Sequence, residues 1–192
     1  MQRIAMSWLV YRLSGSAWLL GATAFAGQIA VLFLAPFGGL WADRVDRRKL
    51  LIWTQAAAAA PAFVLAGLTY LDVVEVWHVI VLATILGVVI AIDAPIRQSF
   101  LPEMVPVTND LPSAIAFNSG MYNVGRLLGP AIAGVLIIAT SEAFCFLVNG
   151  VTKIIAVLPF LVMVTAPRGQ PSEHVPILRA FKEGVEIGRA HV

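Results

Sequence analysis

The chain is built from long, continuous apolar runs that lack the apolar–polar alternation of membrane β-strands. A helix needs about 20 apolar residues to cross the hydrocarbon of a bilayer. Only helices and closed barrels satisfy their backbone hydrogen bonds there. Each run therefore predicts one membrane-spanning helix. Five complete spans are expected, at residues 13–42, 50–71, 76–92, 111–141 and 143–167.

A further apolar segment, at residues 4–13, reaches only about half the length that a span requires. Arg12 and a Ser-Gly-Ser sequence at residues 14–16 close it, which indicates a turn. We interpret this segment as the second half of a first helix, whose first half precedes Met1 in the native protein. A cleaved secretory signal is not expected, because another apolar run follows without a polar region.

The composition supports a membrane protein. Hydrophobic residues make up 59% of the chain and charged residues 12%, with a mean hydropathy of +0.87. Soluble domains contain about 25% charged residues, and a soluble domain of this length has too much surface to bury so many apolar side chains. The net charge of +2 gives no indication of a nucleic-acid partner.

The composition also argues against an enzyme. The three histidines and the single cysteine, Cys145, show no paired spacing of metal ligands. The chain lacks the phosphate-binding loop of an ATP-driven pump. We therefore predict no cofactor, no metal site and no enzymatic activity.

The charges of the connections alternate along the chain. When the incomplete helix at residues 4–13 is counted as the first, basic residues follow the second, fourth and sixth spans. They lie at residues 42–49, at Arg97 and at residues 168–182. The other two connections, residues 71–76 and the turn at Glu142, contain acidic residues and neither Lys nor Arg. Because basic loops of membrane proteins face the cytoplasm, we expect a multi-pass protein with its basic loops in the cytoplasm.

The chain changes character after the last span. Residues 168–176 are polar and rich in glycine and proline, as in a flexible linker. Residues 177–185 predict a short amphipathic helix, either on the cytoplasmic membrane surface or free in the cytosol. Residues 187–192 resemble a translated sequencing adapter, which predicts a non-native tail. The expected organisation is a transmembrane helical bundle at 1–167, a cytoplasmic central loop at 168–186 and the tail.

The most specific motif lies between the second and third spans, where residues 38–49 read Gly-Gly-Leu-Trp-Ala-Asp-Arg-Val-Asp-Arg-Arg-Lys. It resembles the signature between the second and third helices of the major facilitator superfamily, with Asp46 where a second glycine is usual. In that family the loop locks the two halves of the transporter in the outward-facing state. A plain basic anchor loop is the alternative. The resemblance assigns gating to Gly39, Asp43, Arg44, Arg47 and Arg48.

These residue types also have roles that follow from their chemistry. Gly39 lets two helices approach closely. Asp43, near the expected start of the third span, can accept hydrogen bonds from free N–H groups at a helix start. The basic side chains, together with Lys49, can bind anionic lipid.

A second motif occupies the fifth span, where residues 125–134 read Gly-Arg-Leu-Leu-Gly-Pro-Ala-Ile-Ala-Gly. It resembles the antiporter signature of the same superfamily, which is associated with export, except that Ala133 replaces one glycine. The glycines should let a neighbouring helix pack closely, and Pro130 should bend the helix. An ordinary packing face is the alternative. The glycines in question are Gly125, Gly129 and Gly134.

Charged residues inside apolar spans are a third group of candidates, because they normally face a cavity or one another. For Asp93 two interpretations stay open: a local ion pair with Arg97 or Arg126, or a site that takes up and releases protons. Lys153 could neutralise an anionic substrate or a carboxylate elsewhere in the full protein. The expected intramembrane charge relay comprises Asp93, Arg97, Arg126 and Lys153.

Together with residues 93–98 and 118–134, these motifs resemble the major facilitator branch that includes enterobactin and macrolide exporters. The resemblance implies an all-α fold, the N-terminal six-helix bundle of a secondary transporter with its first helix incomplete. It also implies proton-coupled export of a drug or siderophore across the inner membrane by alternating access. The implied partners are membrane lipid, a small-molecule substrate, protons and a missing C-terminal half. A non-transporting six-span scaffold, a channel-like protein and an inactive fragment are the alternatives.

Overall fold

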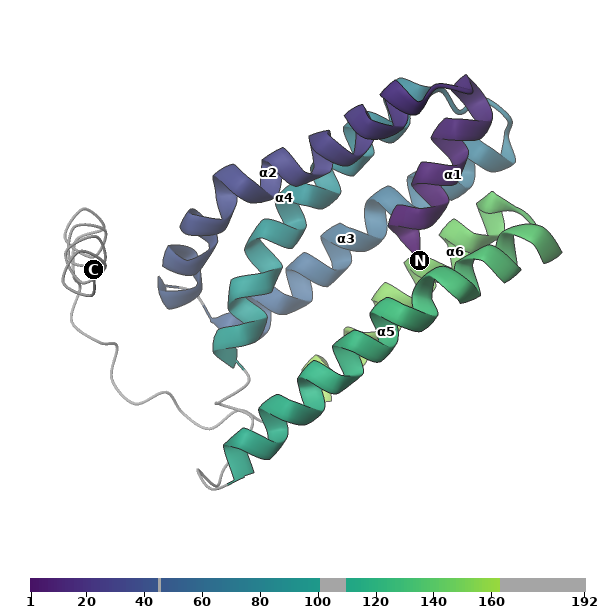
Figure 1. The fold of residues 1–192 in the computed structure, drawn as a ribbon. Helices are drawn as coiled ribbons and strands as arrows, with labels where there is room; N and C mark the ends of the chain where they lie inside the picture. Colours follow the sequence, from purple (N-terminus) through teal and green to yellow (C-terminus); the bar gives the residue numbers. More distant parts are fainter. Residues whose placement is uncertain (45, 101–109, 163–192) are drawn as a thin grey trace, which may run out of the picture.

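The computed structural model describes residues 1–44, 46–100 and 110–162, and within them the side chains of residues 35–44, 47, 99 and 111 are not described. The predicted linker, amphipathic helix and tail lie outside the described residues. Every regular element in the described part is a helix (Figure 1), which confirms the all-α fold. The helices are α1 (Gln2–Ser14), α2 (Ala17–Arg44), α3 (Arg47–Tyr70), α4 (Val76–Phe100), α5 (Leu111–Ala139), α6 (Glu142–Ile155) and α7 (Leu158–Val162).

The described helices contain five segments long and apolar enough to cross a membrane, as the apolar runs predict. These segments are Ala17–Leu34, Arg48–Tyr70, Val76–Gln98, Pro112–Ala139 and Glu142–Val162. The predicted turn after α1 is also present. Gly15 adopts φ 61°, which is accessible to glycine at little cost, and its N–H binds the carbonyl of Tyr11.

The sixth span differs from the continuous helix that the sequence predicts. α6 ends at Ile155 and α7 begins at Leu158. Pro159 explains the interruption, because proline has no N–H to bond the carbonyl four residues earlier, and its ring restricts the preceding backbone. The chain turns at the break through a bond from the Val157 N–H to the Ile154 carbonyl.

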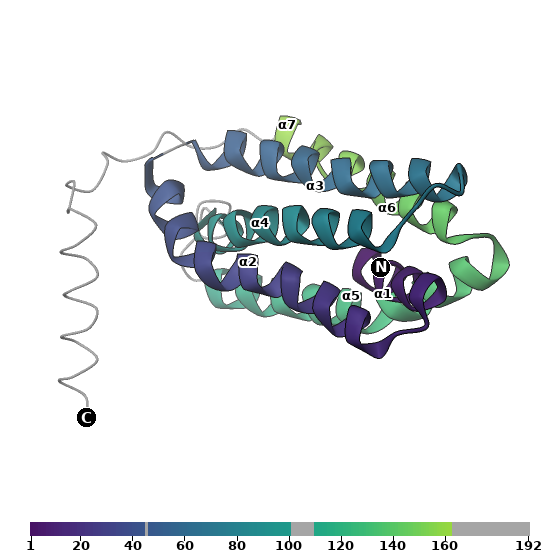
Figure 2. The same ribbon diagram turned by 90° about the horizontal axis from the view of Figure 1, so that it is seen from above.

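The helices form a bundle in which α4 packs against both α2 and α3, and α6 packs on another face of α3. Figure 2 shows α4 between α2 and α3. The short α1 contacts α2, α4, α5 and α6, so it joins the two sides of the bundle. In both views the chain start lies partway along the long α5.

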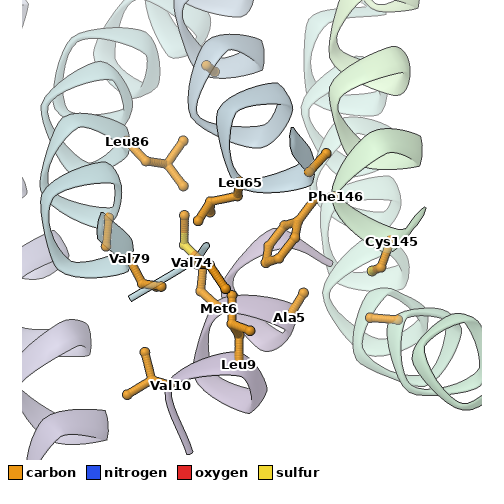
Figure 3. Packing of buried hydrophobic residues seen from close by; sticks show 14 residues of the cluster. Ala5, Met6, Leu9, Val10, Leu65, Val74, Val79, Leu86, Cys145 and Phe146 are labelled. Carbon is orange, nitrogen blue, oxygen red and sulfur yellow. The ribbon is translucent and has the colours of Figure 1, made fainter. Parts of the chain in front are cut away.

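The main apolar core lies around α1. Its fully buried side chains include Leu9 and Val10 of α1, Leu65 of α3, Val79 of α4 and Phe146 of α6. Figure 3 shows these side chains converging from four helices. Burying a side chain of this size contributes about 1.5–3 kcal/mol relative to leaving it exposed in water, so the cluster fixes α1 against its neighbours.

Two small residues bring α2 and α4 together. A Cβ atom built on Gly87 of α4 would overlap the backbone carbonyl of Gly27 on α2, and one built on Gly27 would lie 3.2 Å from the carbonyl oxygen of Ala83. The two backbones are therefore in direct contact, as small residues at helix crossings permit. Another close glycine contact pairs Gly150 of α6 with the ring of Phe63 on α3.

Candidate functional site

A polar network surrounds Asp93, which lies in the last third of α4. The Asp93 Oδ1 atom accepts hydrogen bonds from the Thr54 hydroxyl at 2.7 Å and the Gln55 side-chain amide at 2.9 Å. Its Oδ2 atom accepts from the Arg97 Nε atom at 3.3 Å and the Nη2 atom at 3.1 Å. Arg97 is one helical turn further along α4, so the ion pair has the favourable i, i+4 spacing. Of the two partners considered for Asp93, the structure pairs it with Arg97.

The network is buried on the α3 side and open on the α4 side. Gln55 is 2% exposed and Thr54 is also buried, whereas the side chains of Asp93 and Arg97 are 18% and 49% exposed. Each carboxylate oxygen has a partner, which offsets the cost of removing the charge from water. The sequence reasoning missed Thr54 and Gln55, although they form a polar pair in an otherwise apolar span.

The other two charges of the predicted relay are placed differently. Lys153, on α6, is mostly buried and interacts electrostatically with both Asp93 and Arg97. Arg126, on α5, is exposed and has no hydrogen-bond or ion-pair partner among the described residues. The structure thus brings together three of the four residues and leaves Arg126 apart.

The predicted gating loop is mostly helical. Gly39, Asp43 and Arg44 belong to α2, and Arg47 begins α3; their side chains lie outside the description. The N-cap of α3 is Asp46, whose carboxylate accepts from the N–H groups of Arg48 at 3.0 Å and Lys49 at 3.3 Å. The capping considered for Asp43 therefore belongs to Asp46. The backbone φ of Asp46 is −58°, a value that any residue adopts, so this position does not require the glycine that is usual in the motif.

Arg48 joins α3 to the end of the sixth span. Its Nε atom donates to the Phe160 carbonyl at 2.5 Å and its Nη2 atom to the Leu161 carbonyl at 2.6 Å. The Phe160 ring packs against the small core of Leu51, Ile96 and Phe100. The last carbonyls of a helix have no hydrogen-bond donors within the helix. The guanidinium of Arg48 provides donors for two of them.

We expect Arg48→Gln to destabilise this contact, because hydrogen bonds to charged groups are each worth about 1.5–3 kcal/mol. Thermal unfolding in detergent micelles should show a lower midpoint than for the wild-type chain. Lys49→Gln is the matched control, since it removes the neighbouring exposed charge and leaves these carbonyls paired. Equal midpoints for the two variants would contradict a stabilising role for the bonds from Arg48 to the Phe160 and Leu161 carbonyls.

The glycine motif of α5 packs at one edge. Gly129 is buried, and a Cβ there would lie 3.5 Å from the amino nitrogen of Met1, whereas Cβ atoms at Gly125 and Gly134 would meet nothing within 4 Å. Ala133, one turn after Gly129, is completely buried. The reason is geometric: α1 has 13 residues and α5 has 29, so α1 covers only part of it. Close packing at the other two glycines stays a prediction, and α5 continues through Pro130.

A second buried charge, which the sequence reasoning did not single out, lies at the opposite end of the bundle. Glu142, the first residue of α6, is 7% exposed. Its Oε1 atom accepts from the Trp8 indole N–H at 3.0 Å and is 3.2 Å from the Nε atom of Arg12. Both partners are on α1, so this carboxylate links α1 to α6. The acidic turn and Arg12 could have suggested the pair only if the packing of α1 on α6 were known.

The fold and the site define the chain as a polytopic membrane protein with a charged network inside its helical bundle. Intramembrane charges of this kind mark the substrate and ion pathways of transporters.

Comparison with known proteins gives the family. The family described as "Transmembrane secretion effector" matches residues 1–190, so the chain belongs to this family of major facilitator superfamily transporters. Its members are transporters and not enzymes. No solved structure matches the chain.

Three curated relatives illustrate the likeness. The staphyloferrin A transporter of Staphylococcus aureus is 30% identical over 91% of this chain and 45% of its own length. The multidrug efflux pump Tap of Mycolicibacterium fortuitum is 26% identical over 74% of this chain and 38% of its own. The macrolide efflux protein A of Streptococcus pyogenes is 25% identical over 64% and 30%. The chain thus spans less than half the length of these relatives.

Proposed function

We propose that the chain acts as one half of a proton-coupled exporter of a small molecule, which works by alternating access. Two of the relatives named above are efflux proteins and the third is a siderophore transporter, which favours export of a drug-like or siderophore-like compound. The second half of the same protein would form the other wall of the substrate path. The basic connection around Asp46 would face the cytoplasm of a bacterial inner membrane.

The network around Asp93 is the observation that supports proton coupling. Asp93 is a carboxylate inside a membrane span. The neutral donors of Thr54 and Gln55 bind one of its oxygens, and the half-exposed guanidinium of Arg97 binds the other. Protonation would remove the attraction for Arg97 while Thr54 and Gln55 keep the side chain in place. The Arg97 guanidinium is half-exposed and free to turn toward water, so one proton can change the charge presented at this end of the bundle.

The same network supplies a place in the transport cycle. Asp93 lies seven residues before the end of α4, about 10 Å from the end that carries the basic connection. A proton bound there in the outward-facing state would leave to the cytoplasm after the halves rock. Asp43 and its basic neighbours would hold the gate in the alternate state.

Asp93→Asn tests the proposal in the full-length protein. Asparagine keeps an oxygen for Thr54 and Gln55 but cannot ionise, so uphill export driven by a pH gradient should fall at least tenfold. Downhill exchange of substrate should persist. Both rates can be measured in proteoliposomes with a fluorescent efflux substrate.

Glu142→Gln is the matched control for this experiment, because it neutralises a buried carboxylate outside the Asp93 network. We expect it to retain coupled export. If Asp93→Asn exported substrate uphill at the wild-type rate, the role assigned to this carboxylate would be refuted.

A further inference from the structure

A cavity of about 470 Å³ lies between α1, α2 and α4. Its size is within the range of small-molecule sites, about 300–1,000 Å³. Its wall is mainly apolar and includes Gly27 and Gly87, together with polar side chains from two helices. These polar side chains are Arg3, Ser7, Thr23 and Gln28.

The cavity lies at mid-depth in the bundle. Arg3 is eleven residues from the end of α1, Gly27 is ten residues from the start of α2, and Gly87 is eleven residues from the start of α4. At 1.5 Å per residue, all three positions lie about 15–17 Å from the same end of the bundle. This is half of the roughly 30 Å hydrocarbon thickness, the depth at which secondary transporters bind substrates.

Arg3 has no counter-ion in this setting. No Asp or Glu lines the cavity among the described residues, and Arg3 makes no ion pair there. By contrast, the two intramembrane cations Arg97 and Lys153 both lie near the carboxylate of Asp93. A cation at the centre of a membrane is costly unless an anion or water compensates it. Arg126 on α5 also lacks a partner among the described residues, but it does not line this cavity. Arg3 is therefore the cation that the cavity itself offers to an incoming anion.

We propose that this cavity binds the carboxylate of an anionic substrate and that Arg3 selects the negative charge. The guanidinium can bind a carboxylate with two parallel hydrogen bonds. The side chains of Ser7 and Gln28, which have no partners among the described residues, add neutral donors. The apolar wall would hold the hydrocarbon part of the molecule. This inference rests on the proposed transport function, since it names the class of substrate.

Binding to the chain in phosphatidylcholine nanodiscs tests the inference. The probes are naphthalene-2-carboxylate and its uncharged analogue naphthalene-2-carboxamide, titrated by calorimetry against protein and against empty discs. We expect the carboxylate to bind at least tenfold more tightly than the amide. Arg3→Gln should remove this preference and Arg3→Lys should keep most of it. Lys49→Gln, which removes a distant exposed charge, should leave it unchanged.

Two results would overturn the proposal. The first is equal binding of the carboxylate and the carboxamide by the wild-type chain. This result does not depend on the folding of any variant. The second is a preference that survives in Arg3→Gln of wild-type helicity. Repeating the titration in phosphatidylglycerol discs separates the sources of the anion: loss of carboxylate binding there would assign the site to a lipid headgroup and overturn the substrate role. Because this experiment measures binding and not transport, the anion site can be refuted while proton-coupled export is confirmed. Equally, export can be refuted while the anion site is confirmed.

Discussion

Gly87→Leu is expected to prevent the bundle from assembling. Any side chain at this position would meet the backbone carbonyl of Gly27, which cannot move without shifting the whole of α2. Overpacking a core normally destabilises a protein by about 1–3 kcal/mol, and more where the backbone has to shift. A membrane domain of ordinary stability, about 5–15 kcal/mol, would lose a large part of it. The yield of monodisperse protein in size-exclusion chromatography should fall at least fivefold.

Gly21→Leu is the matched control for this experiment. Gly21 is on α2, two turns from Gly27, and a Cβ there would meet nothing within 4 Å. Replacing glycine within a helix with leucine should be neutral or slightly stabilising, because glycine is the poorer helix former. If Gly87→Leu were as monodisperse and as heat-resistant as Gly21→Leu, the close contact of α2 and α4 would be wrong.

Asp43→Asn is expected to abolish export by the full-length protein while membrane insertion stays intact. Asp43 lies one residue before the end of α2, where the helix dipole disfavours a negative charge by about 0.3–1 kcal/mol. The stability of α2 therefore gives no reason for a carboxylate here, and asparagine should fold at least as well. A gate that depends on this charge would fail. Export can be measured as dye efflux from energised cells, and insertion by the protein content of washed membranes.

Asp46→Asn provides an internal comparison three residues away. Asparagine caps helices about as well as aspartate, so the start of α3 and the export rate should both be retained. Unimpaired export by Asp43→Asn, at equal membrane levels, would refute the gate role assigned to that residue.

The spans could be predicted because their signal is local. A run of apolar residues long enough to cross a bilayer leaves the backbone few choices, and the loop charges separate one run from the next. The interrupted sixth span shows the limit of this reasoning. Pro159 lies within an apolar run, and hydropathy alone does not register the missing N–H that ends α6.

The site depended on packing that the sequence does not encode locally. Asp93 and Arg97 are one turn apart on a single helix, so their pairing was among the predictions. Thr54 and Gln55 reach Asp93 only because α3 packs against α4 in one register. The link of Glu142 to Arg12 depends likewise on residues 130 positions apart in the chain.

The glycine motif of α5 shows the same distinction. The spacing of its small residues predicts a packing face, but the length of α1 decides how much of that face is covered within this chain. Gly129 lies beside Met1 at the start of α1 and Ala133 is buried, whereas a Cβ at Gly125 would meet nothing within 4 Å.

Coupled export by the full-length protein tests the central proposal most directly. Proteoliposomes made acidic inside would be diluted into neutral buffer that contains a fluorescent efflux substrate. We predict that substrate accumulates inside against its gradient as protons leave, and that a protonophore stops the accumulation. Accumulation that never exceeds the outside concentration, with or without the pH gradient, would contradict proton-coupled transport.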